Sequence, residues 1–133
     1  MLGYSELEVF DPRIVAMWRT ACRLIDRFPD RDEQGESLRC HEVARAVRQH
    51  LYNMNAVISV VDGRFGLSDH SWLEFWKDGR VVAILDTYAI ASLPVCQLVL
   101  ADSMVGTFSM YEPGPERSDI REDVVAWLGS VAR

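Results

Sequence analysis

The chain has 133 residues, which is enough for one domain with a hydrophobic core and too few for two. Its composition, 49% hydrophobic and 26% charged, is that of an ordinary globular protein and argues against extensive disorder. A net charge of −6 gives no general attraction to phosphate backbones or anionic lipid, so we expect neither nucleic-acid nor membrane binding. We predict a single domain over residues 1–133.

The first residues and the cysteines favour a cytoplasmic protein. The segment MLGYSELEVF lacks the basic start and apolar run of a signal peptide, and no segment approaches the ~18 apolar residues of a membrane span. Three cysteines, Cys22, Cys40 and Cys96, are an odd number at wide spacing. This pattern argues against a disulfide framework and predicts at least one free thiol.

Two helices are predicted in the first part of the chain. Asp11 followed by Pro12 is a typical helix start, and apolar residues at helical spacing extend the first helix over 12–27. After the polar loop DRDEQGE, Ser37 is expected to cap a second, amphipathic helix. Cys40 is therefore predicted in the first turn of this helix, on its buried side.

The second part of the chain predicts an antiparallel sheet followed by a helix. Asp119 is expected to cap this last amphipathic helix. The order of the elements predicts an α+β domain, with the sheet packed against the N-terminal helical pair and a C-terminal helix. The expected strands are AVISVV at 56–61, SWLEFW and VVAILD as a hairpin, and PVCQLVLA at 94–101, with DGRFGLSD and YEPGPERSD as loops.

The position of Cys40 has chemical consequences. A thiol in the first turn of a helix lies near a partial positive charge, which stabilises the thiolate and lowers the pKa from about 8.5. The alternative is a purely structural cysteine, because small cysteines on apolar helix faces usually belong to the core. We favour the structural interpretation for Cys22 and Cys96, and the nucleophile for Cys40.

A thiolate nucleophile needs a base, and the base needs an acceptor that orients it. The hairpin SDHSWLEFWKDGRVVAILD, residues 68–86, offers His70 and Asp86. An unpaired carboxylate among the apolar neighbours of Asp86 would be unfavourable, which favours a partner for it. The alternative is that both residues are ordinary solvated strand ends.

The length of the hairpin turn decides whether this pair can form. A two-residue loop at DG would put His70 opposite Thr87, whereas a three-residue loop at KDG would put His70 opposite Asp86. The sequence permits both loops. We favour the three-residue loop, because it brings His70 and Asp86 together on one face.

No metal or cofactor site is expected. His41 neighbours Cys40 but is expected to point to a different side of the helix, and His50 can interact with the helix dipole. The segment HEVAR at 41–45 lacks the second histidine of HExxH, and the chain has no CxxC pair.

Taken together, these residues resemble the papain-like cysteine enzymes, in particular their transglutaminase-like branch. The resemblance covers about residues 34–90. It rests on helix-borne Cys40, on His70 in HSWLEF and on Asp86 in VAILDTY. It implies a papain-like fold with a Cys-His-Asp triad of nucleophile, general base and orienting acid. Gln34, in QGESLRC, is similar to the glutamine that donates to the oxyanion hole in papain-like proteases.

The expected function is cysteine-dependent acyl transfer on an amide bond of a protein or peptide, as in a protease, amidase, deamidase or transglutaminase. Trp72 and Tyr88 are candidates for the walls of a substrate pocket, although aromatic residues on strands more often belong to the core. The alternative function is a catalytically silent papain-like protein that binds or inhibits a protein partner.

Overall fold

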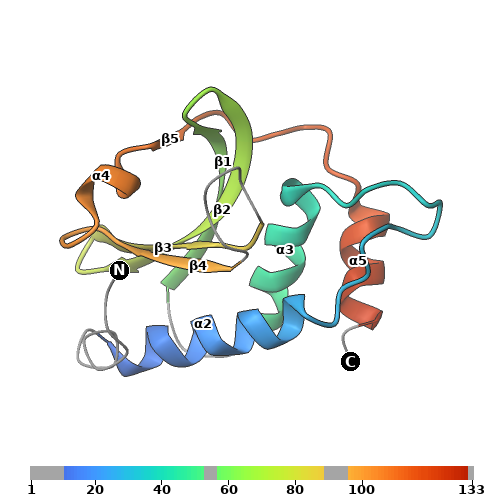
Figure 1. Cartoon of the computed structure of the whole chain (residues 1–133), viewed down its shortest axis with the longest axis horizontal. Helices are drawn as coiled ribbons and strands as arrows, with labels where there is room; N and C mark the ends of the chain where they lie inside the picture. The colour runs from blue at the N-terminus through green and yellow to red at the C-terminus, as the bar shows by residue number, and fades with distance from the viewer. Residues whose placement is uncertain (1–10, 53–56, 89–95, 132–133) are drawn as a thin grey trace.

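The computed structural model describes residues 11–52, 57–88 and 96–131 of the chain. Over these residues the fold is α+β, and five strands form one antiparallel sheet in the order β4-β3-β2-β1-β5. Figure 1 shows α2 running along one side of the curled sheet, with α3 between the sheet and α5. The predicted α+β class, with an antiparallel sheet packed on helices, is confirmed.

The described residues form two elements that the sequence does not predict. A short helix and a short fifth strand, neither of them expected, lie between the hairpin and the last helix. The helices are α2 (Pro12–Ile25), α3 (Cys40–Leu51), α4 (Val105–Phe108) and α5 (Glu122–Val131). The strands are β1 (Val57–Phe65), β2 (Ser68–Lys77), β3 (Arg80–Asp86), β4 (Gln97–Leu100) and β5 (Tyr111–Pro113). Residues 56 and 94–95 of the predicted strands lie outside the described part.

The helix starts agree with the sequence only in part. Asp11 caps α2, since its Oδ1 accepts from the backbone N–H of Arg13 at 3.0 Å, but the helix ends at residue 25 and not at 27. Ser37 does not cap α3, because it forms a β-bridge with Arg31. The N-cap residue of α3 is Arg39, whose side chain makes no capping hydrogen bond. The N-terminus of α3 therefore has no side-chain cap.

The predicted cap of the last helix is also wrong. Helix α5 begins at Glu122, and the carboxylate of Asp119 instead accepts hydrogen bonds from Arg39 at 3.1 Å and from Arg117 at 2.9 Å. Two guanidinium groups attract this carboxylate more strongly than backbone N–H groups do. Asp119 thus links the start of α3 to the segment before α5.

Residues 62–65, predicted as a loop, belong to β1, which turns into β2 at Gly66 and Leu67. Gly63 is a glycine because β5 lies against it, opposite Pro113, and not because it bends the chain. A Cβ atom at this position would collide with the carbonyl oxygen of Glu112 and lie 2.9 Å from the ring of Trp72.

We expect Gly63→Ala to lower the free energy of unfolding by about 2 kcal/mol, because the new methyl group overpacks backbone that cannot move away. Gly129→Ala is the matched control, since nothing lies within 4 Å of the added Cβ and alanine favours the helix α5. Urea denaturation measures both variants. Equal stability of the two proteins would contradict the close approach of β5 to β1.

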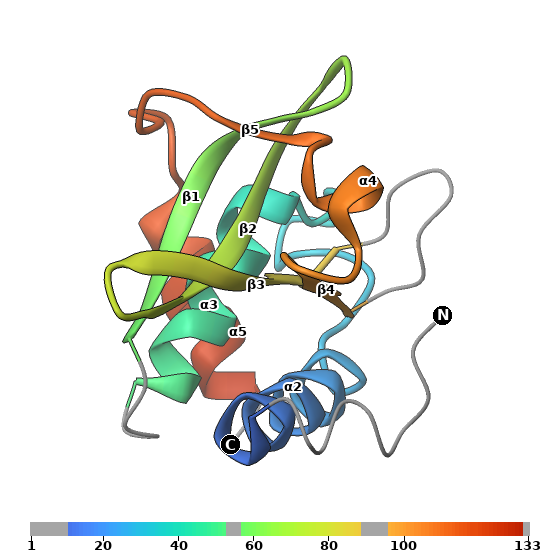
Figure 2. The same ribbon diagram turned by 90° about the vertical axis from the view of Figure 1, so that its left-hand side faces the viewer.

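Two hydrophobic clusters cover the two faces of the sheet. On the helical side, Leu73 and Phe75 of β2 belong to the larger cluster, which includes residues of α2, α3 and α5. On the other side, Trp72 belongs to a smaller cluster with Ile84 and Tyr111. Figure 2 shows the strands with α3 and α5 behind them and α4 beside the opposite face. The strand residues on the side of the smaller cluster carry the candidate site.

Candidate active site

The turn between β2 and β3 has two residues, so the predicted three-residue loop is wrong. Lys77 lies opposite Arg80, and the turn residues Asp78 and Gly79 have φ of 54° and 77°. Two positive φ values in succession are typical of a type I′ turn, whose twist matches that of the flanking strands. By itself this turn would put His70 and Asp86 on opposite faces of the sheet.

A β-bulge corrects this register and brings the two residues together. Trp76 lies opposite Val81, but Phe75 lies opposite Ala83, so β3 contains one extra residue. Beyond the bulge the register places Asp86 on the face that carries His70. His70 Nε2 lies 3.0 Å and 2.9 Å from the two carboxylate oxygens of Asp86. The predicted contact is therefore present, but through a different turn.

Asp86 is surrounded by hydrogen-bond donors. It is 1% exposed, and besides His70 it accepts from the hydroxyl of Tyr111 at 2.6 Å and from the backbone N–H of Tyr88 at 3.1 Å. A carboxylate can satisfy all these donors because it has only acceptor atoms. Tyr111 belongs to β5, so the unexpected fifth strand contributes directly to the site. Tyr111 is not predicted from the sequence, because no local pattern indicates β5.

His70 is buried and is favoured in its protonated form. Burial opposes this form, but the hydrogen bond to Asp86 and the proximity of Cys40 outweigh it and raise the pKa of His70 to about 9. The imidazole packs among aromatic rings, with centroid distances of 6.2 Å to Trp72 and 6.4 Å to Phe65. Because Nε2 is bonded to Asp86, Nδ1 is the nitrogen that remains for another partner.

Cys40 is the first residue of α3, as predicted, and is 8% exposed. Its sulfur acts on His70 strongly enough to raise the pKa of that imidazole. It also raises the pKa of Tyr88, in addition to the larger effect of burial. Cys40, His70 and Asp86 are therefore brought together from α3, β2 and β3. The thiol lies at the uncapped N-terminus of α3, where partial positive charge stabilises an anion.

A second imidazole also contacts the thiol, contrary to the expectation for His41. His41 Nδ1 lies 3.5 Å and Nε2 3.9 Å from the sulfur of Cys40. The same Nδ1 lies 2.6 Å from the hydroxyl of Ser71, which donates to Asp62 at 2.6 Å. The ring rotates toward β2 because Ser71 and Asp62 are buried polar groups that need partners. Its sequence signal is only the adjacency to Cys40.

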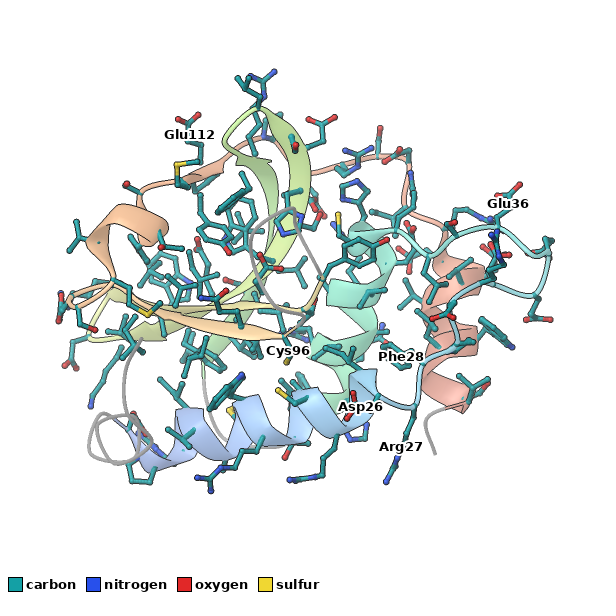
Figure 3. The ribbon with its side chains drawn as sticks, in the orientation of Figure 1. Asp26, Arg27, Phe28, Glu36, Cys96 and Glu112 are labelled. Carbon is teal, nitrogen blue, oxygen red and sulfur yellow. The ribbon has the colours of Figure 1, made fainter. Side chains whose placement is uncertain are left out.

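Gln34 is held by residues other than the predicted catalytic ones. It lies in the exposed turn between α2 and α3, where its side-chain oxygen accepts from Arg121 at 3.3 Å. Figure 3 shows Glu36, two residues later, at the outer edge of this loop beside α5. Among the hydrogen bonds of the described residues, Gln34 shares none with Cys40 or His70.

The two aromatic candidates occupy different environments. Trp72 is fully buried, and its indole donates to Glu74 at 3.1 Å, so it supports His70 from the core and faces no solvent. Tyr88 is half-buried, and its hydroxyl donates to the carbonyl of Leu38 at 2.7 Å. Tyr88 also lines a cavity of about 350 Å³, next to the start of α3. The other lining residues are Ile25, Phe28, Pro29, Asp30, Leu38, Val43 and Thr87.

The described residues contain neither a candidate metal centre nor a helix that could span a membrane. No three histidine, cysteine or acidic side chains within this part of the chain gather in a way that could hold a metal ion. In the same residues, every helix is too short or too polar to traverse a lipid bilayer.

Comparison with known proteins gives no relative for this chain: no family model, no curated protein and no solved structure matches it. The function must therefore be argued from the residues and their geometry.

Proposed function

We propose that the protein is a papain-like, transglutaminase-like cysteine enzyme that transfers the acyl group of an amide in a protein or peptide. The observation that carries this proposal is the buried hydrogen bond between His70 and Asp86 beside a cysteine that begins a helix. Cys40 supplies a nucleophilic thiol, His70 an imidazole that exchanges protons, and Asp86 a carboxylate that orients the imidazole. An activated free thiol also suits a reducing compartment, so we place the protein in the cytoplasm.

In the resting site, protonated His70 lies beside the sulfur of Cys40. Asp86 holds Nε2 of the imidazole, which leaves Nδ1 for another partner. The raised pKa of His70 and the N-terminus of α3 both favour this charge distribution. The thiolate attacks the amide carbonyl, and His70 donates its proton to the leaving amine.

The cavity beside Tyr88 is the place we assign to the substrate. It has a volume of about 350 Å³, and most of its lining is apolar, with Phe28 and Leu38 as examples. Figure 3 shows Phe28 beyond the end of α2, on the side of α3. A largely apolar pocket favours an uncharged substrate side chain over a charged one.

Alkylation of Cys40 with iodoacetamide tests the nucleophile. We expect Cys40 to react at neutral pH, and we expect His70→Ala to slow this reaction at least tenfold, because the cationic partner of the thiol is lost. Peptide mass spectrometry assigns the label, and half-buried Cys22 in the same molecule is the internal reference. A profile centred near pH 8.5 in both proteins would refute the activated thiol.

The competing function is a catalytically silent protein that binds a partner, and one observation favours it. Cys40 is only 8% exposed, which restricts the approach of a substrate. If native Cys40 resists iodoacetamide at every pH up to 9 while Cys22 reacts, the binding function becomes the better explanation. Labelling of Cys40 ahead of Cys22 at neutral pH supports the enzyme.

A further inference from the structure

The contacts of His41 are not used by the proposed triad. This imidazole touches the sulfur of Cys40 and begins a second chain of hydrogen bonds through Ser71 to Asp62. Cys40 therefore lies between two histidines, each of which is bonded, directly or through a hydroxyl, to a buried carboxylate. Two such histidines beside one thiol can act in different steps of one reaction.

The hydrogen-bond directions define the tautomer of His41. Burial would raise the pKa of Asp62, but hydrogen bonds from Arg45, the backbone of Arg117 and Ser71 lower it to about 2. Asp62 is therefore a carboxylate at neutral pH and accepts the only hydroxyl proton of Ser71. Ser71 can then only accept from His41, so Nδ1 carries the proton and Nε2 has a free lone pair.

The charges around His41 keep it neutral. Burial lowers the pKa of His41, and so do the nearby guanidinium groups of Arg117 and Arg39. Glu42 and Asp62 act in the opposite direction, but their effects are smaller. Glu42 is compensated by a bidentate pair with Arg39, at 2.7 Å and 2.6 Å. His41 is thus available as a base under conditions in which His70 holds a proton.

We propose that His41 is the general base of the second half-reaction, in which the acyl group leaves Cys40. This inference rests on the proposed function. It assigns the two histidines separate tasks: His70 forms the ion pair with the thiol and protonates the leaving amine, and His41 activates the attacking water. Pairs of titratable groups held in opposite protonation states commonly divide acid and base roles in this way.

The step is balanced as follows. The Nε2 atom of His41 takes one proton from water, and the oxygen forms a bond to the thioester carbonyl carbon. The tetrahedral intermediate then breaks its carbon–sulfur bond, and the electron pair returns to the sulfur of Cys40. His41 releases the proton to solvent, and His70, whose own proton left with the amine, takes up a new proton from solvent. The distance of 3.9 Å between Nε2 and the sulfur places the base beside the acylated atom.

The variant His41→Asn tests this role, because its amide keeps a donor to Ser71 but has no imidazole Nε2. With p-nitrophenyl acetate as the probe, we expect a nitrophenolate burst within about threefold of the wild-type rate. We expect the following steady-state release to be at least 100-fold slower. Acetylated Cys40 should accumulate and be detected by peptide mass spectrometry. His50→Asn, an exposed histidine of the same helix, is the matched control and should leave both phases unchanged.

The outcomes separate this inference from the proposed function. No burst and no acetylated Cys40 in the wild type would refute both. A burst with equal steady-state rates in His41→Asn and the wild type would refute only the role of His41. If the variant does not fold, the pH dependence of wild-type deacetylation decides: we expect a rise that is complete by about pH 6.5. A rise centred above pH 7 would overturn the assignment.

Discussion

Replacing Asp86 with asparagine is expected to lower the rate of Cys40 alkylation at pH 7 at least tenfold and the free energy of unfolding by about 3 kcal/mol. The carboxylate is 1% exposed and accepts from His70 through both oxygens. Without its charge, the burial of His70 is no longer opposed by Asp86, so the pKa of the imidazole falls. The thiol then loses its cationic partner.

Tyr111→Phe is the matched control for this variant. It removes the 2.6 Å hydrogen bond to Asp86 but leaves the carboxylate and its contact with His70 in place. We expect a loss of about 2 kcal/mol in stability, with the pH profile of alkylation unchanged. Thermal denaturation and iodoacetamide labelling of the same samples give both values. Equal effects of the two variants on the labelling profile would show that packing around Asp86, and not its charge, controls the thiol.

The second prediction concerns how stability depends on pH in Cys40→Ala. The pKa of His70 is raised above the unfolded value, so the native state holds a proton that the unfolded chain releases. This contribution is complete below the unfolded pKa of about 6.5 and is lost as pH rises through the folded pKa. We expect the free energy of unfolding to fall by up to about 1.4 kcal/mol per pH unit above pH 6.5.

Alanine at position 40 makes this measurement simple to interpret. Without the sulfur, His70 is the group of this pair whose protonation the slope reports. Cys40 helps to raise the pKa of His70 to about 9 in the wild type. In Cys40→Ala this pKa should be lower, so the loss of stability with rising pH should stop below pH 9. Urea unfolding at several pH values gives the curves. In the double variant Cys40→Ala/His70→Gln, the free energy of unfolding should not change with pH over this range. A slope parallel to that of Cys40→Ala would assign the effect to another group.

Some of the fold could be predicted because local signals define it. The Asp11 cap with Pro12 placed the first helix, and the alternation in SWLEFW and VVAILD placed two strands. The signals failed where a residue has a role in tertiary contacts. Gly63 looks like a turn residue but allows β5 to approach β1, and Asp119 looks like a cap but pairs with arginines. Local propensity cannot report contacts between distant segments.

In the candidate site, too, local signals were sufficient for some residues and tertiary contacts decided the others. Residue type and spacing were enough to single out Cys40, His70 and Asp86, because a helix-borne thiol, a strand histidine and a carboxylate within an apolar run are unusual. The turn preceding Asp86 was assigned the wrong length, since the sequence permits both loops and contains no sign of the bulge. His41 is expected on a different side of the helix from Cys40, but its ring contacts the sulfur.

By itself, the sequence determined an α+β fold with Cys40 at a helix start and with His70 and Asp86 near the ends of a hairpin, and it left open whether these two residues pair. Only the tertiary structure decided that a bulge in β3 restores the face shared by His70 and Asp86, and that β5 brings Tyr111 to the same carboxylate. Only it showed that Ser71 and Asp62 hold His41 against the thiol. The physical reason is that buried polar groups must find partners, and those partners come from strands that are distant in the chain.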